Sequence, residues 1–429
     1  MISQIIFIVV LLVAIVSFWL AVRRISNNIK LGRPIEVTGD SAQRWKTMFM
    51  VAIGQSKMVT RPFAGILHIF VYAGFIIINI EVLEILIDGV MGTHRVFSFL
   101  GEFYTFLISA FEYLAVAVWL ACFIFLLRRN VAKLKRFWSR EMTTWPRSDA
   151  NIILTTEILL MTAFLFLDAS DTILMRNVKG FPISNFLVPM LNGCSIPTLE
   201  FIEHFCWWFH IIGILAFLNY VPYSKHFHIL LAFPNVYYSN LKPKGEFTNL
   251  ASVTKEIKLM LDPSSAPADA GNAAPPERFG AKDVFDLSRH QLMNAYSCTE
   301  CGRCTSSCPA NQTGKLLSPR KIMMDTRDRL EEVGKNIAKN GKFVDDGKSL
   351  LGNYILPEEI WACTSCNACV QECPVNIDPL SIIVDIRRFL VMEQSAAPQE
   401  LAMMLNNIEN NGAPWQFPAS DRLNWANGL

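Results

Sequence analysis

Charged residues are scarce in this chain: they make up 18% of its 429 residues, whereas 52% are apolar. The 39 basic and 37 acidic side chains nearly cancel, and the sequence has no long run of Lys or Arg. This charge balance gives no indication of a nucleic-acid partner. The apolar content is too high for an ordinary soluble protein of this length, so we expect part of the chain to lie in lipid.

The cysteines are not scattered along the chain as they would be in a disulfide-stabilised protein. Eight of the eleven fall in two short runs, and only Cys122, Cys194 and Cys206 lie elsewhere. Because Cys122 sits inside an apolar segment, we expect it to be a small buried hydrophobic residue. The clustering therefore predicts reduced thiolates that act together, as the ligands of a metal centre do, rather than disulfides.

Both cysteine runs follow the pattern C-x2-C-x2-C-x3-C-P, which is the bacterial signature of a [4Fe-4S] cluster. The first run is Cys298, Cys301, Cys304 and Cys308 before Pro309, and the second is Cys363, Cys366, Cys369 and Cys373 before Pro374. Structural zinc usually takes two separated ligand pairs, which this pattern does not supply. Two runs therefore predict two clusters, which transfer single electrons.

The fourth cysteine of such a run ligates the neighbouring cluster in two-cluster ferredoxins. By analogy, we expect Cys373 to join the first three cysteines of the first run and Cys308 to join the first three of the second.

Five apolar segments are candidates for membrane-spanning helices. They are residues 5–22, 63–87, 99–127, 152–167 and 201–221. The first segment lacks a basic leader and a small-residue cleavage site, so we interpret it as an uncleaved span rather than a signal peptide.

The basic residues between the spans predict the orientation. Residues 23–61 and 128–147 together carry fifteen Lys and Arg residues, whereas the other two loops carry three. The positive-inside rule therefore places the first two loops in the cytoplasm and the N-terminus outside. We expect a multi-pass protein of a bacterial or archaeal cytoplasmic membrane, with the cysteine runs in the cytoplasm.

The predicted fold is all-α, with four parts. Residues 1–240 form a transmembrane bundle, 241–280 a cytoplasmic segment with a Pro/Ala/Ser-rich linker at 262–278, 281–395 a two-cluster domain, and 396–429 a tail that is a candidate for partner docking. Ser318 before Pro319 and Asp378 before Pro379 predict helix starts. About 55 residues separate the cysteine runs and no strand alternation is present, which favours an α-helical ferredoxin domain.

Histidines at membrane depth are costly and usually functional. His68 lies in the second span, and His210 and His228 lie 18 residues apart on or just beyond the fifth. In one continuous helix that spacing is five turns and about 27 Å, so both would share a face at opposite depths. Such a helix can give one imidazole to each of two b-type hemes. Because His68 matches the depth of His228, we predict this pair as ligands of one heme b, while a kink at Pro222 would favour His226.

A second heme needs a partner for His210 about ten residues beyond His68, where the chain has Ile78 and Asn79. His94 and His204 are the remaining alternatives, so the sequence predicts one heme b and leaves a second open.

Four carboxylates also fall within the spans, at Glu81, Glu84, Glu112 and Glu157. Quinone reduction consumes protons, so Glu81 and Glu84 are candidates for proton transfer or for contact with a quinone head group. Helix–helix hydrogen bonds are the alternative explanation for all four.

The membrane part resembles two families of heme proteins. The motifs HIFVYAG and WWFHIIGILAFLNYVPYSKHFHILLAFPN are similar to those of the gamma subunits of respiratory nitrate reductase and of the cytochrome b subunit of membrane heterodisulfide reductase. The resemblance implies heme ligation by His68 and His228, with His210 as a distal ligand. The second span of the nitrate reductase family carries two histidines, and this chain has only one there.

The last 170 or so residues resemble the iron-sulfur subunits of heterodisulfide reductase and quinone-linked oxidoreductases that serve electron-transfer flavoproteins or hydroxy acid oxidation. The tail NNGAPWQFPASDRLNWANGL is similar to the segment that precedes cysteine-rich CCG domains in those proteins. This sequence has no Cys-Cys pair, so the resemblance implies that substrate chemistry belongs to a separate CCG-domain protein or flavoprotein in a hetero-oligomeric complex.

These observations predict a subunit of a quinone-linked oxidoreductase. We expect it to pass electrons between a cytoplasmic redox partner and membrane quinone through two [4Fe-4S] clusters and heme b. The alternative is a non-catalytic membrane anchor that feeds electrons to a quinone site on another protein of the complex.

Overall fold

The computed structural model describes residues 1–34, 37, 39–174, 180–243, 245–265 and 278–427. Within these ranges the regular structure is helical and contains no strand; two isolated bridges, Arg33 with Ser288 and Leu351 with Ile355, are the only strand-like pairings. Most of the predicted linker at 262–278 lies outside the described residues. The prediction of a helical protein is confirmed for the part of the chain that can be seen.

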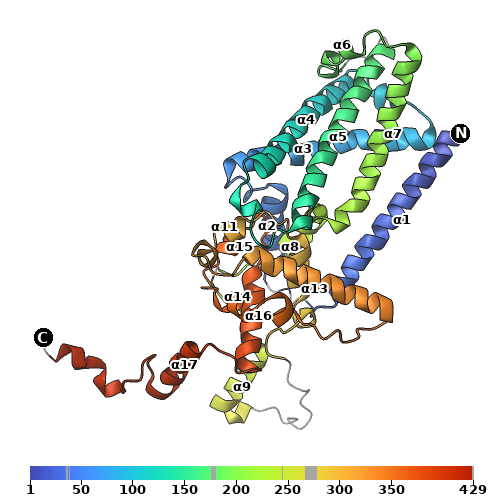
Figure 1. The fold of residues 1–429 in the computed structure, drawn as a ribbon. Coiled ribbons are helices and arrows are strands. Elements are labelled where there is room, and N and C mark those ends of the chain that lie inside the picture. The colour runs from blue at the N-terminus through green and yellow to red at the C-terminus, as the bar shows by residue number, and fades with distance from the viewer. Residues whose placement is uncertain (35–36, 38, 175–179, 244, 266–277, 428–429) are drawn as a thin grey trace.

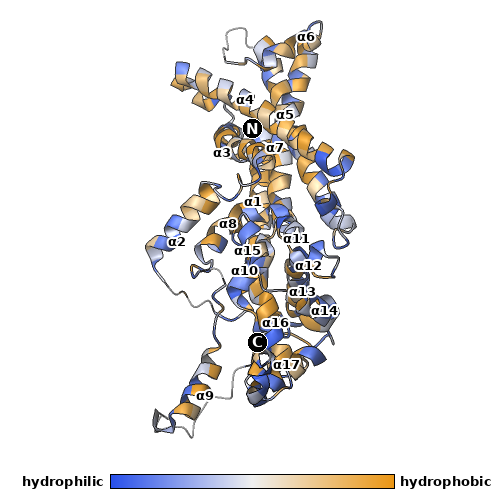
Figure 2. Ribbon diagram, turned by 90° about the vertical axis from the view of Figure 1, so that its left-hand side faces the viewer, coloured by the Kyte–Doolittle hydropathy of each residue, from blue (hydrophilic) through white to orange (hydrophobic). Residues whose placement is uncertain are grey.

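Five long apolar helices form one half of the molecule (Figures 1 and 2). They are α1 (Ile2–Lys30), α3 (Pro62–Met91), α4 (Glu102–Leu126), α5 (Thr144–Leu174) and α7 (Ile196–Tyr220). Each is long and apolar enough to cross a membrane, and each covers most or all of one of the five predicted spans. Large side chains such as Leu12, Phe106 and Phe201 are exposed on their outer surfaces, as expected for helices that face lipid.

The helices of this bundle pack chiefly through α3, α4, α5 and α7, with α1 against α3 and α7. Ile108, Phe111 and Phe164 form the buried centre between α4 and α5. Gly74 allows α3 to approach α4 closely, because a Cβ atom there would lie 2.4 Å from a methyl carbon of Val118.

At one end of the bundle, short polar segments join the helices. The first connection contains α2 (Ser41–Met48) and a π-helical turn (Phe49–Ile53). A π-helical turn (Leu127–Val131) and a 3-10 turn (Lys135–Phe137) follow α4.

The segment after α7 corrects the prediction of one continuous helix through His210 and His228. Helix α7 ends at Tyr220, two 3-10 turns follow (Val221–Tyr223 and Lys225–Phe227), and α8 starts at His228 and runs to Tyr237. Ser224 between the turns is extended, and its hydroxyl accepts a hydrogen bond from the His226 backbone N–H at 3.1 Å. The predicted separation of five helical turns between His210 and His228 is therefore wrong, because the two residues belong to different helices.

The opposite end of the bundle holds α6 (Val188–Leu191) and a buried ion-pair group. The guanidinium of Arg95 donates to Asp168 at 2.7 Å and to Asp171 at 2.5 Å, which ties the α3–α4 loop to α5. The N-terminus of α1 lies toward this end (Figure 1).

The second half of the molecule packs small helices around two cysteine loops. They are α10 (Arg289–Ser297), α11 (Arg303–Ser306), α12 (Pro309–Gln312), α13 (Pro319–Asn340), α14 (Pro357–Trp361), α15 (Ala368–Glu372) and α16 (Pro379–Met392). The predicted helix starts are confirmed: Ser318 caps α13 by accepting from the Lys321 N–H, and Asp378 caps α16 by accepting from the Ser381 N–H.

Helix α1 extends beyond its predicted span and joins the two halves. Its last turns pack against α10 and α13, where the Asn28 side chain donates to the Tyr296 hydroxyl at 2.9 Å. Gly334 of α13 makes this approach possible, because a Cβ atom there would lie 2.2 Å from the Asn28 side-chain oxygen.

Two helices stand apart from this body, α9 (Ala251–Leu261) and α17 (Gln399–Asn411) (Figure 1). Helix α17 buries none of its residues and leads to a 3-10 segment (Ala419–Ala426) with no buried residue.

Candidate metal centre and its contacts with the membrane helices

The two cysteine loops have equivalent backbone conformations. In the first loop, Glu300 and Gly302 have positive φ angles of 54° and 70° before the short helix α11. In the second, Ser365 and Asn367 have positive φ angles of 55° and 60° before α15. Left-handed residues between consecutive cysteines curl the chain tightly, so that three sulfur atoms can face one point.

Helices α11 and α15 pack against each other, which brings the two loops together. A small cavity is lined by Cys298, Cys301 and Cys304 of the first loop and by Cys369 and Cys373 of the second. On the other side, burial raises the pKa values of the Cys363 and Cys369 thiols, and the nearby Cys308 adds a smaller increase to both. Cys373 thus lies near the first three cysteines of the first loop, and Cys308 lies near Cys363 and Cys369 of the second.

The electrostatics of the thiols suit iron. Burial raises the pKa of Cys298 to about 12, and burial together with Cys301, Cys298 and Cys373 raises the pKa of Cys304. Crowded thiolates repel one another in the absence of a cation, and bound iron would supply the positive charge that offsets this repulsion. Backbone N–H groups also point at sulfur, from Ser365 to Cys363 at 3.4 Å and from Ile377 to Cys373 at 3.3 Å. Such donors favour the thiolate and tune cluster potentials.

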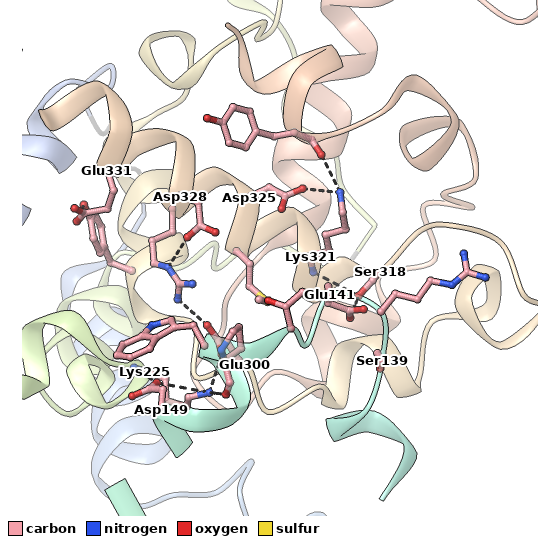
Figure 3. A pocket seen from close by; sticks show the side chains of 18 of the residues that line it. Ser139, Glu141, Asp149, Lys225, Glu300, Ser318, Lys321, Asp325, Asp328 and Glu331 are labelled. Atoms are coloured by element: carbon pink, nitrogen blue, oxygen red, sulfur yellow. Dashed lines mark hydrogen bonds and ion pairs between the residues drawn. The ribbon is translucent and has the colours of Figure 1, made fainter. Parts of the chain in front are cut away.

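Glu300, between the first two cysteines, connects the first loop to the segment that follows α7. Its carboxylate accepts from Lys225 Nζ at 2.7 Å and from Arg327 at 2.9 Å. Lys225 immediately precedes His226, and its Nζ also donates to the Pro146 carbonyl at 2.6 Å. Figure 3 shows Lys225 between Asp149 and Glu300 at the edge of a cleft of about 1200 Å³ between the two halves.

Arg303 makes a second connection, from the first cysteine loop to the segment before α3. It donates to the backbone carbonyls of Lys57 and Met58, at 3.0 Å in each case. Arg61 of the same segment donates to Glu372 at 2.9 Å, and Lys57 donates to Asn376 at 2.8 Å. These contacts hold both cysteine loops against the end of α3 that carries His68.

A third connection links the loop after α4 to α13. Arg320 is fully buried and donates to Glu141 at 2.7 Å and to the Arg136 carbonyl at 2.7 Å. Burial works against ionisation of Glu141, but Arg320 and the Ser318 hydroxyl hold the pKa of this carboxyl below its usual range.

Three of the predicted histidines lie together at this end of the bundle. The ring centres of His226 and His228 are 5.5 Å apart, and His68 is near enough to interact electrostatically with both. The Nδ1 atoms of His68 and His226 are buried and have no hydrogen-bond partner, whereas Nδ1 of His228 is 3.0 Å from the Lys225 carbonyl. A metal-binding imidazole characteristically has one nitrogen fixed this way and the other free.

The other histidines have different surroundings. His210 is buried in α7 with Nδ1 3.0 Å from the Leu160 carbonyl and its ring 6.0 Å from Phe164. His204 is 72% exposed beside Glu203. His94 pairs with Asp171 at 3.4 Å at the far end of the bundle.

The membrane carboxylates fall into two groups. Glu84 accepts from the Phe97 N–H and the Tyr104 hydroxyl, at 2.7 and 3.0 Å, and Glu112 accepts from the Ile183 N–H at 2.7 Å. These contacts match the structural alternative, in which the carboxylates hold helices and loops together. Glu81 is different, because one of its buried oxygens has no partner. Cys122 is buried, as expected.

Sequence reasoning missed the residues that join the two halves: Lys57, Arg61, Lys225, Glu300, Arg303 and Arg320. Glu300 and Arg303 stand inside the first cysteine motif, where a charged residue needs a partner if the loop is buried. Their position within the motif could have identified Glu300 and Arg303 as residues that need a partner, but it could not have identified the partners.

Residues 297–377 match the family model for the 4Fe-4S dicluster domain. The chain is 28% identical to the probable iron-sulfur-binding oxidoreductase FadF of Bacillus subtilis, over 99% of this chain and 60% of that protein. It is 26% identical to the EtfAB:quinone oxidoreductase of Syntrophomonas wolfei, over 90% of this chain and 54% of that protein. No solved structure matches.

A shorter similarity, 30% identity over 28% of this chain, covers 60% of one polypeptide of the ferredoxin/F(420)H(2)-dependent CoB-CoM heterodisulfide reductase of Methanosarcina acetivorans. The relatives are therefore iron-sulfur oxidoreductases and heterodisulfide reductase subunits, which fits the helical dicluster half of the molecule. The chain spans only about 60% or less of each of these relatives.

Proposed function

We propose that this chain passes electrons between a redox partner protein and membrane quinone through two [4Fe-4S] clusters and heme b. One cluster is held by Cys298, Cys301, Cys304 and Cys373, and the other by Cys363, Cys366, Cys369 and Cys308. The proximity of each fourth cysteine to the opposite loop supports this ligand assignment. Similarity over 90% of the chain to an EtfAB:quinone oxidoreductase supports quinone as the membrane substrate.

The observation that carries the proposal is the direct packing of the first cysteine loop on the histidine segment. The Glu300–Lys225 ion pair places this loop beside His226 and His228, and Arg303 places it beside the start of α3. Electron transfer from a cluster to a heme requires the two groups to lie close together. The first cysteine loop and the three histidines lie at the same contact between the two halves.

For heme b we propose His68 and His228 as axial ligands, with His226 as the alternative to His228. The two come from different elements, α3 and α8, and therefore can approach a macrocycle from two sides. His210 is the candidate for a second heme, and Glu81 is the candidate for proton transfer to quinone, since one of its buried oxygens has no partner.

The proposed orientation places the cysteine half in the cytoplasm. The two loops rich in Lys and Arg are residues 23–61 and 128–147, and both contact the cysteine half, through Arg61 and through the Arg136 carbonyl. Because cytoplasmic loops carry the excess of positive charge, this shared location supports the assignment.

We propose the tail at 396–429 as the docking segment for a CCG-domain protein or a flavoprotein. Met403, Ile408 and Trp425 are exposed on elements that bury no residue, so the tail presents apolar surface to a partner.

The proposal predicts that His68→Ala abolishes the heme b absorbance bands of dithionite-reduced membranes and stops reoxidation of the clusters by quinone. The [4Fe-4S] signals in electron paramagnetic resonance should remain, because His68 is outside the cysteine half. His204→Ala is the matched control: its ring is mostly exposed, and both properties should be unchanged.

The same preparations test the rival role of a non-catalytic anchor. Purified protein that contains both clusters but no heme, and whose clusters quinone does not oxidise, would support the anchor and contradict our proposal.

A further inference from the structure

A cavity of about 150 Å³ lies at the junction between α4, α5 and the segment that follows α7. Its lining includes three arginines, Arg128, Arg129 and Arg136, together with His226 and Lys225. The rest is apolar and includes Phe125, Ile153 and Leu154. A cavity with several cationic side chains on one side and apolar side chains on the other suits a ligand that has both an anionic group and an apolar part.

The arginines of this cavity have no carboxylate partners within the described part of the chain. Each guanidinium instead lies over an aromatic ring: Arg128 over Phe63 at 4.8 Å, and Arg129 and Arg136 over Phe137 at 4.6 and 4.8 Å. One nitrogen of each of the three side chains is buried without a hydrogen-bond acceptor, as is Nδ1 of His226. Buried donors without acceptors are costly, and an anion would satisfy several at once.

The nearest acidic groups pair with Lys225 of the cavity lining and with residues outside the cavity, not with the three arginines. Glu300 accepts from Lys225 and Arg327, and Asp149 accepts from the Tyr220 hydroxyl at 2.6 Å and the Lys225 N–H at 3.1 Å. Positive charge therefore remains in excess around the cavity.

The position of the cavity indicates where the anion comes from. Arg128 and Arg129 lie in the last turn of the candidate span Glu102–Val131. Trp138, whose indole N–H donates to the Arg129 carbonyl at 3.0 Å, is 42% exposed, as is typical of aromatic residues at a membrane surface. If Glu102–Val131 spans the bilayer, phospholipid head groups lie at the level of its last turn.

The volume also constrains the ligand. Pockets that enclose whole cofactors or drug-sized ligands measure about 300–1,000 Å³. A cavity of about 150 Å³ suits a phosphate with its first carbon atoms, while the remaining acyl chains lie in the bilayer.

We propose that this cavity is a binding site for the phosphate group of an anionic phospholipid, held by Arg128, Arg129 and Arg136. Arginine is suited to the task because its planar donors match phosphate oxygens in pairs. The bound lipid would fasten the loop after α4, which also contacts the first cysteine loop through Arg320.

The test uses the full chain with its metal groups, placed in bilayers of phosphatidylcholine alone or of phosphatidylcholine mixed with phosphatidylglycerol. Wild-type protein should retain phosphatidylglycerol after detergent extraction, measured by mass spectrometry, and should unfold at a higher temperature in the mixed bilayers. A double variant, Arg128→Gln with Arg129→Gln, should bind phosphatidylglycerol roughly tenfold more weakly or worse. Arg140→Gln is the control, because Arg140 is an exposed arginine of the same loop that does not line the cavity.

A second variant protects the test against misfolding. Ile153→Trp fills the apolar wall and keeps all three arginines, so loss of phosphatidylglycerol with normal cluster signals would also support the site. Wild-type levels of bound phosphatidylglycerol in the double variant would overturn the proposal. Stabilisation of the protein in phosphatidylcholine by inorganic phosphate alone would likewise overturn it, in favour of a soluble anion.

Heme content separates this inference from the proposed function. A double variant that loses heme b and keeps phosphatidylglycerol would show that the arginines serve the heme and not a lipid. Wild-type protein that binds phosphatidylglycerol but contains no heme would contradict the proposed function alone.

Discussion

Glu300 is the residue on which the contact between the first cysteine loop and the membrane half most depends. Its side chain is only 3% exposed, and its partner Lys225 only 9%. A buried ion pair adds little net stability compared with an apolar pair, but removing one partner leaves the other charged and desolvated. The structure therefore makes the pair costly to break.

Glu300→Gln should lower the free energy of unfolding by about 3–5 kcal/mol, which is typical of broken buried pairs. Thermal unfolding in detergent, followed together with cluster absorbance, measures the loss. Arg61→Met is the matched control, because Arg61 and Glu372 are each 33% exposed and such pairs contribute only about 0.2–1 kcal/mol. Equal losses in the two variants would contradict the special role of Glu300.

The same pair gives a pH dependence. Burial opposes ionisation of Glu300, yet Lys225 and Arg327 hold its pKa below the usual range. A carboxyl with a lowered folded-state pKa stabilises the protein above its unfolded-state pKa of about 4.3, and this stability is lost as pH falls through the folded-state value. The stability difference between wild type and Glu300→Gln should therefore shrink below about pH 4.

At the scale of elements, the cysteine loops depend on left-handed residues between the sulfur atoms. Gly302 has a φ of 70°, and a Cβ atom there would lie 2.6 Å from a guanidinium nitrogen of Arg320. Arg320 cannot easily move away, since it is fully buried and bonded to Glu141. The equivalent position in the second loop is Asn367, a residue type that tolerates this conformation.

Gly302→Ala should reduce the iron content of the protein more than Gly341→Ala does, because the new methyl group adds a steric contact with Arg320 to the backbone strain. The strain of alanine in a left-handed conformation is about 1–2 kcal/mol. Gly341→Ala carries that strain without a steric contact, because Gly341 has a φ of 75° and nothing within 4 Å of its Cβ position. Iron analysis and thermal unfolding of both variants test the difference, and the same iron content in both would show that the Arg320 contact is unimportant.

Local patterns in the sequence were sufficient for much of the fold. Apolar length predicted all five long helices, and Ser318 and Asp378 predicted the starts of α13 and α16. A kink at Pro222 was considered, but the full break after Tyr220 was not predicted, because Pro222 fits the first turn of a new segment as well as it fits a kink. The pairing of Glu300 with Lys225 joins residues 75 positions apart, and no local periodicity encodes such a contact.

At the scale of the whole molecule, the helical bundle and the cysteine half share one apolar cluster, which includes Ile25, Val221 and Phe227, and buried polar contacts add to it. The contacts come from three separate stretches, before α3, after α4 and after α7, and each meets the cysteine half at a buried arginine or lysine. Helix α1 adds a continuous rod that enters both halves. Four attachments of this kind restrict rotation of one half against the other, so the distance between sulfur and histidine groups is fixed by the fold.

If the two clusters exchange their fourth cysteines as we propose, this exchange has a consequence for assembly. Cys308 stands with the second set of thiols, and Cys373 stands with the first. Neither set is complete until both loops have folded and met, although 54 residues lie between the two runs. Under this assignment, iron insertion at one set would require the other loop to be in place, so a protein with only one folded loop would complete neither cluster.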